Sequence, residues 1–305
     1  MEAIKTFFRT MYQNKQAFVG MLILIGFLLM ATVGRMIVPL DLSTDFPNRF
    51  QLPSLAHPFG TDHVGNDLFQ QIVHGSASVL FIGLLASFFT VTLGFFLGAL
   101  AGFVGGAVDK IISLVAQILV TIPLFPIQLI IAVVFPIQSV ITLAVVLACL
   151  TWGWLALNVR STILSLKQRD FVLICRIMGL PKTHIIFKEI FPNITSWLAA
   201  TFVLNTHGAI GVSVALMFLG MAPLDPVHWF VILSNATAQS VGGMNTAGLF
   251  NMFVPAFAFI LLQMALVFFA NGLDEALNPR LRAAKKVKNA RKPQAEVTGG
   301  VKNGA

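Results

Sequence analysis

Charged side chains are scarce in this chain of 305 residues. Only 10% of the residues are Asp, Glu, Lys or Arg, whereas about 25% are charged in ordinary soluble domains. Hydrophobic residues instead make up 57%, above the usual share of about 45 to 50%. This composition excludes a soluble globular protein.

Cysteine and the common catalytic motifs are also lacking. The two cysteines, Cys149 in an apolar run and Cys175 in a basic loop, cannot form a disulfide framework, and we interpret them as packing residues. The chain has no G-x-x-x-x-G-K-[ST] phosphate loop, no H-E-x-x-H zinc motif and no G-x-S-x-G nucleophile elbow. We therefore predict that it is not an enzyme and that it binds no metal or cofactor of its own.

Long apolar runs are what the sequence has instead. A helix needs about 20 apolar residues to cross a bilayer core about 30 Å thick, and six segments meet this requirement. The sequence therefore predicts an all-α polytopic membrane protein with six transmembrane helices. The six predicted spans are residues 17–38, 78–105, 111–135, 139–158, 196–219 and 249–270.

The basic residues predict the orientation of these spans. If the N-terminus is cytoplasmic, only Arg35 and Arg49 of the twenty lysine and arginine residues fall outside. Basic residues collect on the cytoplasmic side of membrane proteins, so both termini are predicted to be cytoplasmic. The same rule explains the formal net charge of +8. It predicts a lipid bilayer, and no nucleic acid, as the partner of the basic residues.

The spans divide the chain into segments of different character. We predict an N-terminal basic segment with the first transmembrane helix, an external segment, a five-helix core with a large inside loop, and a disordered basic cytoplasmic tail. In that order these are residues 1–40, 41–77, 78–282 with the loop at 160–193, and 283–305.

Polar residues inside the predicted spans are few. The fifth span contains Asn205, Thr206 and His207, while the span interiors contain no Asp, Glu or Lys. A buried, hydrogen-bonded histidine and the wall of a water-filled pathway both remain open, as does a proton or metal site. Pro123 and Pro126 each remove a backbone hydrogen bond and therefore predict a bend in the third span.

Three external histidines and two aspartates are spaced like no standard metal site. A metalloenzyme centre built on them stays a minor alternative. These residues are His57, Asp62, His63, Asp67 and His74.

The inside loop predicts a helix, a glycine turn and a second helix. After Asp170, a predicted N-cap, apolar residues recur at positions i, i+3, i+4 and i+7, which is one face of a helix. They are Phe171, Ile174, Cys175 and Met178. Gly179 is predicted to end this helix, Thr183 to cap the second and Pro192 to end it. An apolar face at the membrane surface predicts contact with another protein or with the core of this chain.

Four motifs in order carry a family resemblance. Residues 14–20 read N-K-x-A-x-x-G, residues 57–67 read H-P-x-G-T-D-x-x-G-x-D with Gly75 downstream, the inside loop has the glycine and the closing proline, and residues 271–282 are similar to G-L-R-D-A-L-D-P-R-L-R. In these motifs the chain resembles the inner-membrane permease subunits of ATP-binding-cassette importers, in the dipeptide, oligopeptide and nickel branch.

The chain departs from the family pattern at several positions. Three apolar residues replace the E-A-A of the coupling loop, Asn66 and Ala77 replace arginines, and Ser213 replaces a glutamate of the fifth span. The three apolar residues are Leu173, Ile174 and Cys175.

The resemblance implies partners and a location. It implies a second homologous permease subunit, two ATPase subunits that bind ATP and Mg²⁺, and an extracellular or periplasmic substrate-binding protein, all at a bacterial cytoplasmic (inner) membrane. By the same resemblance, the loop between the fourth and fifth spans carries a cytoplasmic coupling helix that docks on the ATPase. Its residues would be Asp170, Phe171, Leu173, Ile174, Cys175, Arg176 and Gly179, with Pro192 closing the loop.

The resemblance further implies a translocation pathway shared with the second permease. Candidate lining residues in this chain are Asn205, Thr206, His207 and Ser213. Peptides are the expected cargo, and nickel or another metal chelate is the alternative. A secondary carrier that needs no ATP is the competing function from a different class.

Overall fold

The computed structural model describes residues 2–135, 137–223, 225–240 and 246–277, and these are nearly all helical. Within these ranges the only β-type pairing is an isolated bridge between Thr61 and Asp67. The predicted tail, residues 283–305, lies outside the described residues.

Twelve α-helices and three short helical turns follow one another along these ranges. The α-helices are α1 Glu2–Gln13, α2 Lys15–Leu29, α3 Arg35–Ile37, α4 Leu68–Val104, α5 Gly106–Thr121, α6 Leu124–Val134, α7 Val140–Leu166, α8 Asp170–Ile177, α9 Lys182–His184, α10 Phe191–Phe218, α11 Trp229–Ser240 and α12 Thr246–Leu277. The turns are the π-helical η1 Met30–Gly34, the 3-10 turn η2 Phe46–Asn48 and the π-helical η3 Ile185–Ile190.

Five helical segments of the described chain are long and apolar enough to cross a membrane. They are Lys15–Ile37, Leu68–Val104, Val140–Leu166, Lys182–Phe218 and Thr246–Leu277. A sixth span exists only if α5 and α6 are counted together, because the chain bends by 94° between them. Pro123 directly precedes α6 and lacks the N–H that would continue α5, so the predicted bend is confirmed.

The second span begins earlier than predicted. Its helix, α4, begins at Leu68 because the Asp67 carboxylate accepts hydrogen bonds from the backbone N–H groups of Phe69 and Gln70. The first turns of α4 are polar, and a hydropathy window therefore overlooks them. The predicted external segment covers residues 41–77, and its last part, from Leu68 onward, is therefore helix rather than loop.

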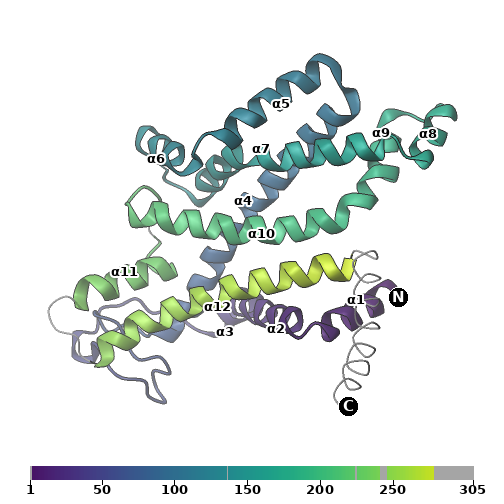
Figure 1. Cartoon of the computed structure of the whole chain (residues 1–305). Helices are drawn as coiled ribbons and strands as arrows, with labels where there is room; N and C mark the ends of the chain where they lie inside the picture. Colours follow the sequence, from purple (N-terminus) through teal and green to yellow (C-terminus); the bar gives the residue numbers. More distant parts are fainter. Residues whose placement is uncertain (1, 136, 224, 241–245, 278–305) are drawn as a thin grey trace, which may run out of the picture.

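Helix α4 is the centre of the fold and packs along α7 (Figure 1). At Gly98 a side chain would meet the carbonyl oxygen of Ala156 at 2.5 Å, so only glycine allows this approach. Small residues serve this purpose between membrane helices, where close packing replaces the hydrophobic effect as the driving force. Cys149 lies exposed on α7, so its prediction as a packing residue is wrong.

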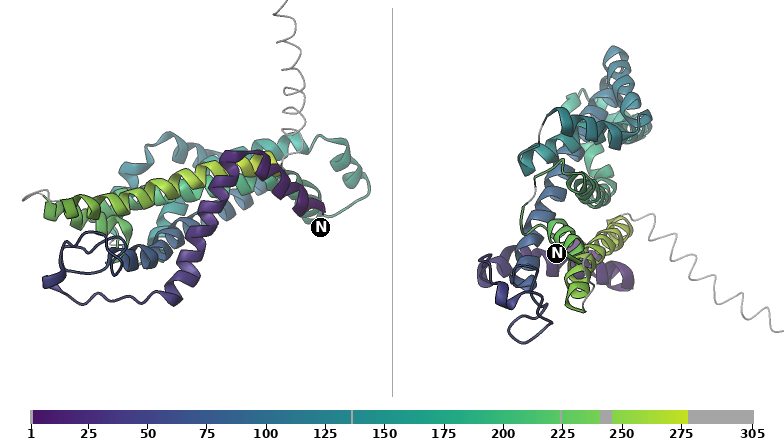
Figure 2. Two further views of the ribbon diagram at one scale, coloured as in Figure 1. Left: turned by 90° about the horizontal axis from the view of Figure 1, so that it is seen from below. Right: turned by 90° about the vertical axis from the view of Figure 1, so that its left-hand side faces the viewer.

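The two ends of the molecule carry different segments (Figures 1 and 2). One end holds α11 and the long segment between α3 and α4. The opposite end holds α1, α8, α9 and the last turn of α12. We call these the α11 end and the α8 end. The N-terminal helix and the predicted inside loop therefore share one end, as the predicted topology requires.

Candidate functional site

Helix α8 is a short helix with a defined glycine stop. It begins at Asp170, and Arg169 is its N-cap, so the prediction of Asp170 as N-cap is wrong by one position. Asp170 instead places its carboxylate in the first turn, where negative charge is favourable. After Ile177 the chain turns at Gly179, whose φ of 70° suits glycine. The predicted glycine turn is confirmed, and two backbone hydrogen bonds of the Schellman type close it.

The second helix of the loop does not end where the sequence predicted. Thr183 lies inside α9 rather than at its cap, and α9 continues through the π-helical turn η3 directly into α10. Pro192 lies where the π-helical turn η3 passes into α10, inside this continuous helical run. The prediction that Pro192 ends this helix is therefore wrong.

One side of α8 is anchored in the protein. Val172 is fully buried in a cluster with Phe103 of α4, Ile163 of α7 and Ile190 of η3. Phe171 and Cys175 are half-buried against the same cluster. The buried side of α8 therefore packs in one cluster with residues of α4, α7 and η3.

The other side of α8 is apolar and exposed. Four large side chains form this surface, which we call the α8 outer face, with exposed fractions from 42% to 86%. They are Leu173, Ile174, Ile177 and Met178. The single apolar face predicted from periodicity is therefore split, since Phe171 and Cys175 point inward whereas Ile174 and Met178 point outward.

Two basic side chains, one at the end of α7 and one on α8, lie against the end of α4. Lys167 and Arg176 lie over the Phe103 ring at 5.5 and 5.6 Å from its centroid, within cation–π range. The Lys167 ammonium also donates a hydrogen bond of 2.9 Å to the Phe103 carbonyl oxygen. Burial, followed by the nearby charge of Arg176, lowers the pKa of Lys167.

The four candidate pathway residues of α10 lie on different sides of the helix. Thr206 and Ser213 are buried inside the chain, and the Thr206 hydroxyl donates to the Ser87 hydroxyl of α4 at 3.0 Å. Asn205 and His207 are half-buried and line two separate hollows. The structure therefore does not bring these four side chains together.

Both hollows involve α10 and α12, which lie side by side in Figure 1. The first has a volume of about 630 Å³ and adjoins α11, so we call it the α11-side hollow. The second has a volume of about 320 Å³, adjoins α7 towards the α8 end, and is called the α8-side hollow. The α11-side hollow is lined by apolar groups with His207 and Gln263 among them. The α8-side hollow is lined by Trp154, Trp197, Asn205, Asn271 and Asp274, among others.

The two hollows border the same stripe of α12. Gln263 and Val267 line the first hollow, while Asn271 and Asp274 line the second. These positions are spaced by four, four and three residues, which places them on one face of a helix. The two hollows therefore lie one after the other along the same face of α12.

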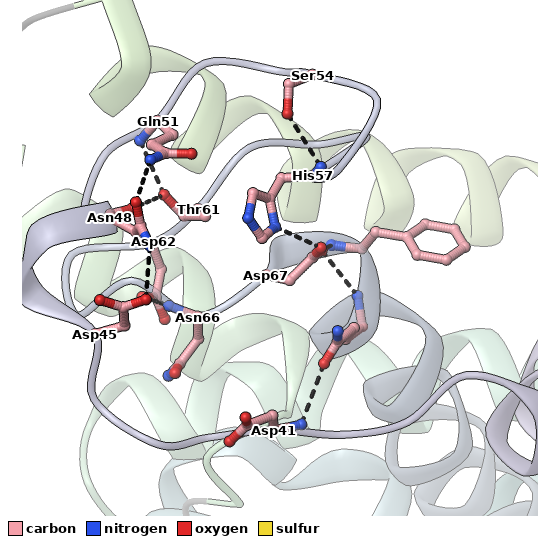
Figure 3. A network of polar contacts seen from close by, with 12 residues as sticks. Asp41, Asp45, Asn48, Gln51, Ser54, His57, Thr61, Asp62, Asn66 and Asp67 are labelled. Carbon is pink, nitrogen blue, oxygen red and sulfur yellow. Dashed lines mark hydrogen bonds and ion pairs between the residues drawn. The ribbon is translucent and has the colours of Figure 1, made fainter.

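His57 belongs to a polar network that folds the segment before α4 (Figure 3). His57 Nδ1 lies 2.9 Å from an Asp67 carboxylate oxygen, and Asp62 accepts hydrogen bonds from two backbone N–H groups and from Gln71. His74 instead contacts the carbonyl oxygen of Val38 at 2.9 Å. Among the described residues, no three His, Cys, Asp or Glu side chains come together as a metal-binding group.

Comparison with known proteins identifies the family. A family model for the binding-protein-dependent transport system inner membrane component matches residues 91–283, and one for the N-terminal transmembrane domain of oligopeptide transport permease C matches residues 3–58. The chain belongs to this family of transport permeases.

Individual permeases match over most of their length. The oligopeptide transport system permease protein OppC of Haemophilus influenzae is 31% identical over 278 residues, which cover 90% of this chain and 88% of that protein. OppC of Bacillus subtilis is 30% identical over a match that covers 88% of this chain and 87% of that protein. The dipeptide permease DppC of Bacillus subtilis is 29% identical over a match that covers 90% of this chain and 85% of that protein.

Several contacts of this permease were not anticipated from its sequence. Asp109 of α5 forms an ion pair with Arg160 of α7, and Asp225 accepts a hydrogen bond from Ser78. At the α11 end the Trp229 indole N–H donates to the Ile72 carbonyl oxygen at 2.9 Å. The one feature of the sequence that pointed to this last contact was Gly75 of the family motif, because a side chain there would collide with Val227 and Trp229.

His228, next to Trp229, is a buried neutral histidine. Its Nδ1 accepts a hydrogen bond from the backbone N–H of Phe230 at 3.2 Å, and the ring is 1% exposed. Burial lowers its pKa to about 4, against the opposing influence of Asp225. Protonation of Nδ1 would break this hydrogen bond and place a charge in the core.

Proposed function

We propose that this permease is the transmembrane subunit of an ATP-driven importer. In this proposal it forms a translocation pathway with a second, homologous permease subunit, and two separate ATPase subunits bind ATP and Mg²⁺. A substrate-binding protein outside the membrane delivers the cargo, and the chain itself performs no catalysis.

The α8 outer face is the observation that carries the proposal. Ile177 and Met178 are 86% and 69% exposed on a helix outside the membrane-spanning segments. Large apolar side chains grouped in this way at a protein surface mark a contact with another protein. An ATPase subunit that covers Leu173, Ile174, Ile177 and Met178 would remove them from water, so α8 serves as the coupling helix.

The anchoring of α8 supports a mechanical role. Its buried side packs in one cluster with α4, α7 and η3, and Arg176 lies over the Phe103 ring of α4. When two ATPase subunits close on ATP, the docked helices move with them, and packed helices respond as rigid bodies rather than by gradual deformation. Alternating access of the pathway follows from this two-state movement.

The orientation follows from the charge distribution. Lys167, Arg176 and Lys182 all belong to the α8 end, where basic residues of a cytoplasmic face are expected. We therefore assign the α8 end and both termini to the cytoplasm, and the α11 end to the outside of a bacterial cytoplasmic membrane. The network of Figure 3 then belongs to the surface that a substrate-binding protein would reach.

Peptides are the proposed cargo. The named relatives are oligopeptide and dipeptide permeases, which favours peptides over nickel or another metal chelate. The seam between α10 and α12, which includes Asn205 and His207, is the part of this chain that we assign to the pathway wall. Thr206 and Ser213 support that wall from inside the fold.

Affinity purification of the tagged permease from its native membrane tests the assembly. Mass spectrometry of the retained proteins should find a second permease and one or two ATPase subunits. Recovery of this chain alone, together with transport that continues without nucleotide in liposomes, would instead favour a secondary carrier.

A further inference from the structure

Among the residues that the structure describes, the Asp274 carboxylate in the α8-side hollow has no hydrogen-bonding or ion-pair partner. Asp274 lies three residues before the end of α12 and lines this hollow between α7, α10 and α12. Among the described residues it forms no hydrogen bond or ion pair, and no lysine or arginine lines the hollow. Asp274 is half-buried near the end of α12, so its carboxylate can meet a cation that enters the hollow.

Aromatic and amide groups line the same hollow as this carboxylate. The rings of Trp154 and Trp197 lie 6.3 Å apart and are tilted by 42°, and both line the hollow. Asn205 uses its amide N–H to donate to the Thr201 carbonyl oxygen at 3.0 Å, which leaves its own carbonyl oxygen as an acceptor. Asn271 is exposed beside it on α12.

These groups share one preference, which is for a compact cation that donates hydrogen bonds. A carboxylate forms charge-assisted hydrogen bonds with an ammonium group, and tryptophan faces attract the same charge through cation–π interactions. Amide oxygens accept the remaining N–H groups. A lipid acyl chain would leave the Asp274 carboxylate and the Asn205 carbonyl oxygen unsatisfied, so it is a poor occupant.

The volume of the hollow agrees with a small polar ligand. At about 320 Å³ it falls at the lower end of the range of about 300 to 1,000 Å³ for ligand pockets. It also continues the α12 stripe that begins at Gln263 in the α11-side hollow. A group that moves along the seam therefore reaches Asp274 last.

We propose that the α8-side hollow binds the terminal ammonium group of a peptide before release into the cytoplasm, with Asp274 as the counter-charge and Trp154 and Trp197 as the aromatic walls. This proposal rests on the proposed function, since it assumes that the permease transports peptides. It adds that this chain recognises the free amino terminus at the inner end of its seam.

The test compares trialanine with N-acetyl-trialanine, which has the same length but lacks the ammonium group. Binding of each to the purified permease–ATPase complex, without nucleotide, is measured by saturation-transfer NMR. Trialanine should bind about tenfold more tightly, because a charged hydrogen bond is lost on acetylation. Asp274→Asn should abolish the preference and Asp274→Glu should retain it. Glu189→Gln removes an acidic side chain from η3 at the same end and should leave the preference unchanged.

Equal binding of the two peptides, or an unchanged preference in Asp274→Asn, would overturn the proposal. Uptake of both peptides by proteoliposomes separates this failure from failure of the proposed function. ATP-driven uptake without preference for the free amino terminus would refute the role of Asp274 alone. Absence of any ATP-driven peptide uptake would refute the proposed function itself.

Discussion

Replacement of Ile177 by alanine tests the α8 outer face most sharply. Ile177 is 86% exposed in the isolated chain, the largest exposed fraction among the four residues of this face. Its side chain makes no part of the buried cluster that anchors α8. The substitution should therefore leave the fold of the permease intact and weaken the contact with the ATPase.

The magnitude follows from the apolar groups removed. Isoleucine loses three carbon atoms on truncation to alanine, and each buried methylene contributes about 0.8 kcal/mol. With 86% of the side chain available for burial by a partner, the expected loss is about 2 kcal/mol. This corresponds to about a thirtyfold increase in the Kd of the ATPase for the permease.

The assay is the affinity of the purified ATPase subunit for detergent-solubilised permease, measured by biolayer interferometry. Ile130→Ala is the matched control, because Ile130 is 61% exposed on α6, away from α8. This control should bind like the wild type. An unchanged Kd for Ile177→Ala, or an equal loss for Ile130→Ala, would refute the assignment of α8 as the docking helix.

Three further predictions follow from the described contacts. Gly179→Pro should abolish ATP-driven uptake while the protein still inserts, because proline cannot adopt the φ of 70° at this turn; normal uptake would contradict the coupling role. Gly75→Ala should destabilise the fold by about 1 to 3 kcal/mol and lower its Tm, because the new Cβ would lie 2.1 Å from the Val227 carbonyl oxygen. Gly26→Ala is the control and should leave the Tm unchanged, because the space around Gly26 is open. Lowering the pH from 6.5 to 4 should reduce the free energy of unfolding by about 3 kcal/mol. The pKa of His228 is lowered to about 4 in the fold, so the unfolded chain binds the proton first. A Tm profile that is as steep in His228→Gln would refute this cause.

Much of the architecture was predictable from the sequence because hydropathy acts locally. Long apolar runs revealed five of the spans, and the prolines at positions 123 and 126 revealed the break between α5 and α6. The glycine turn after α8 was predictable because such a turn needs a residue with positive φ, a conformation that favours glycine. These features depend on residues that are close together in the chain.

Features that depend on distant residues were not predictable. Periodicity grouped Phe171 with Ile174, but the buried side of α8 is decided by Phe103 and Ile190, which come from other helices. The α8-side hollow likewise combines α7, α10 and α12, so Asp274 did not stand out in the sequence. The start of α4 was missed because its first turns are polar and Asp67 caps them.

Nucleotide dependence of peptide uptake tests the central claim most directly. The permease, purified with its retained partners and reconstituted in liposomes with a substrate-binding protein, should accumulate a labelled peptide when ATP and Mg²⁺ are supplied on the α8 side. It should accumulate none with a non-hydrolysable analogue. Equal uptake with and without ATP hydrolysis would contradict the account and favour a secondary carrier.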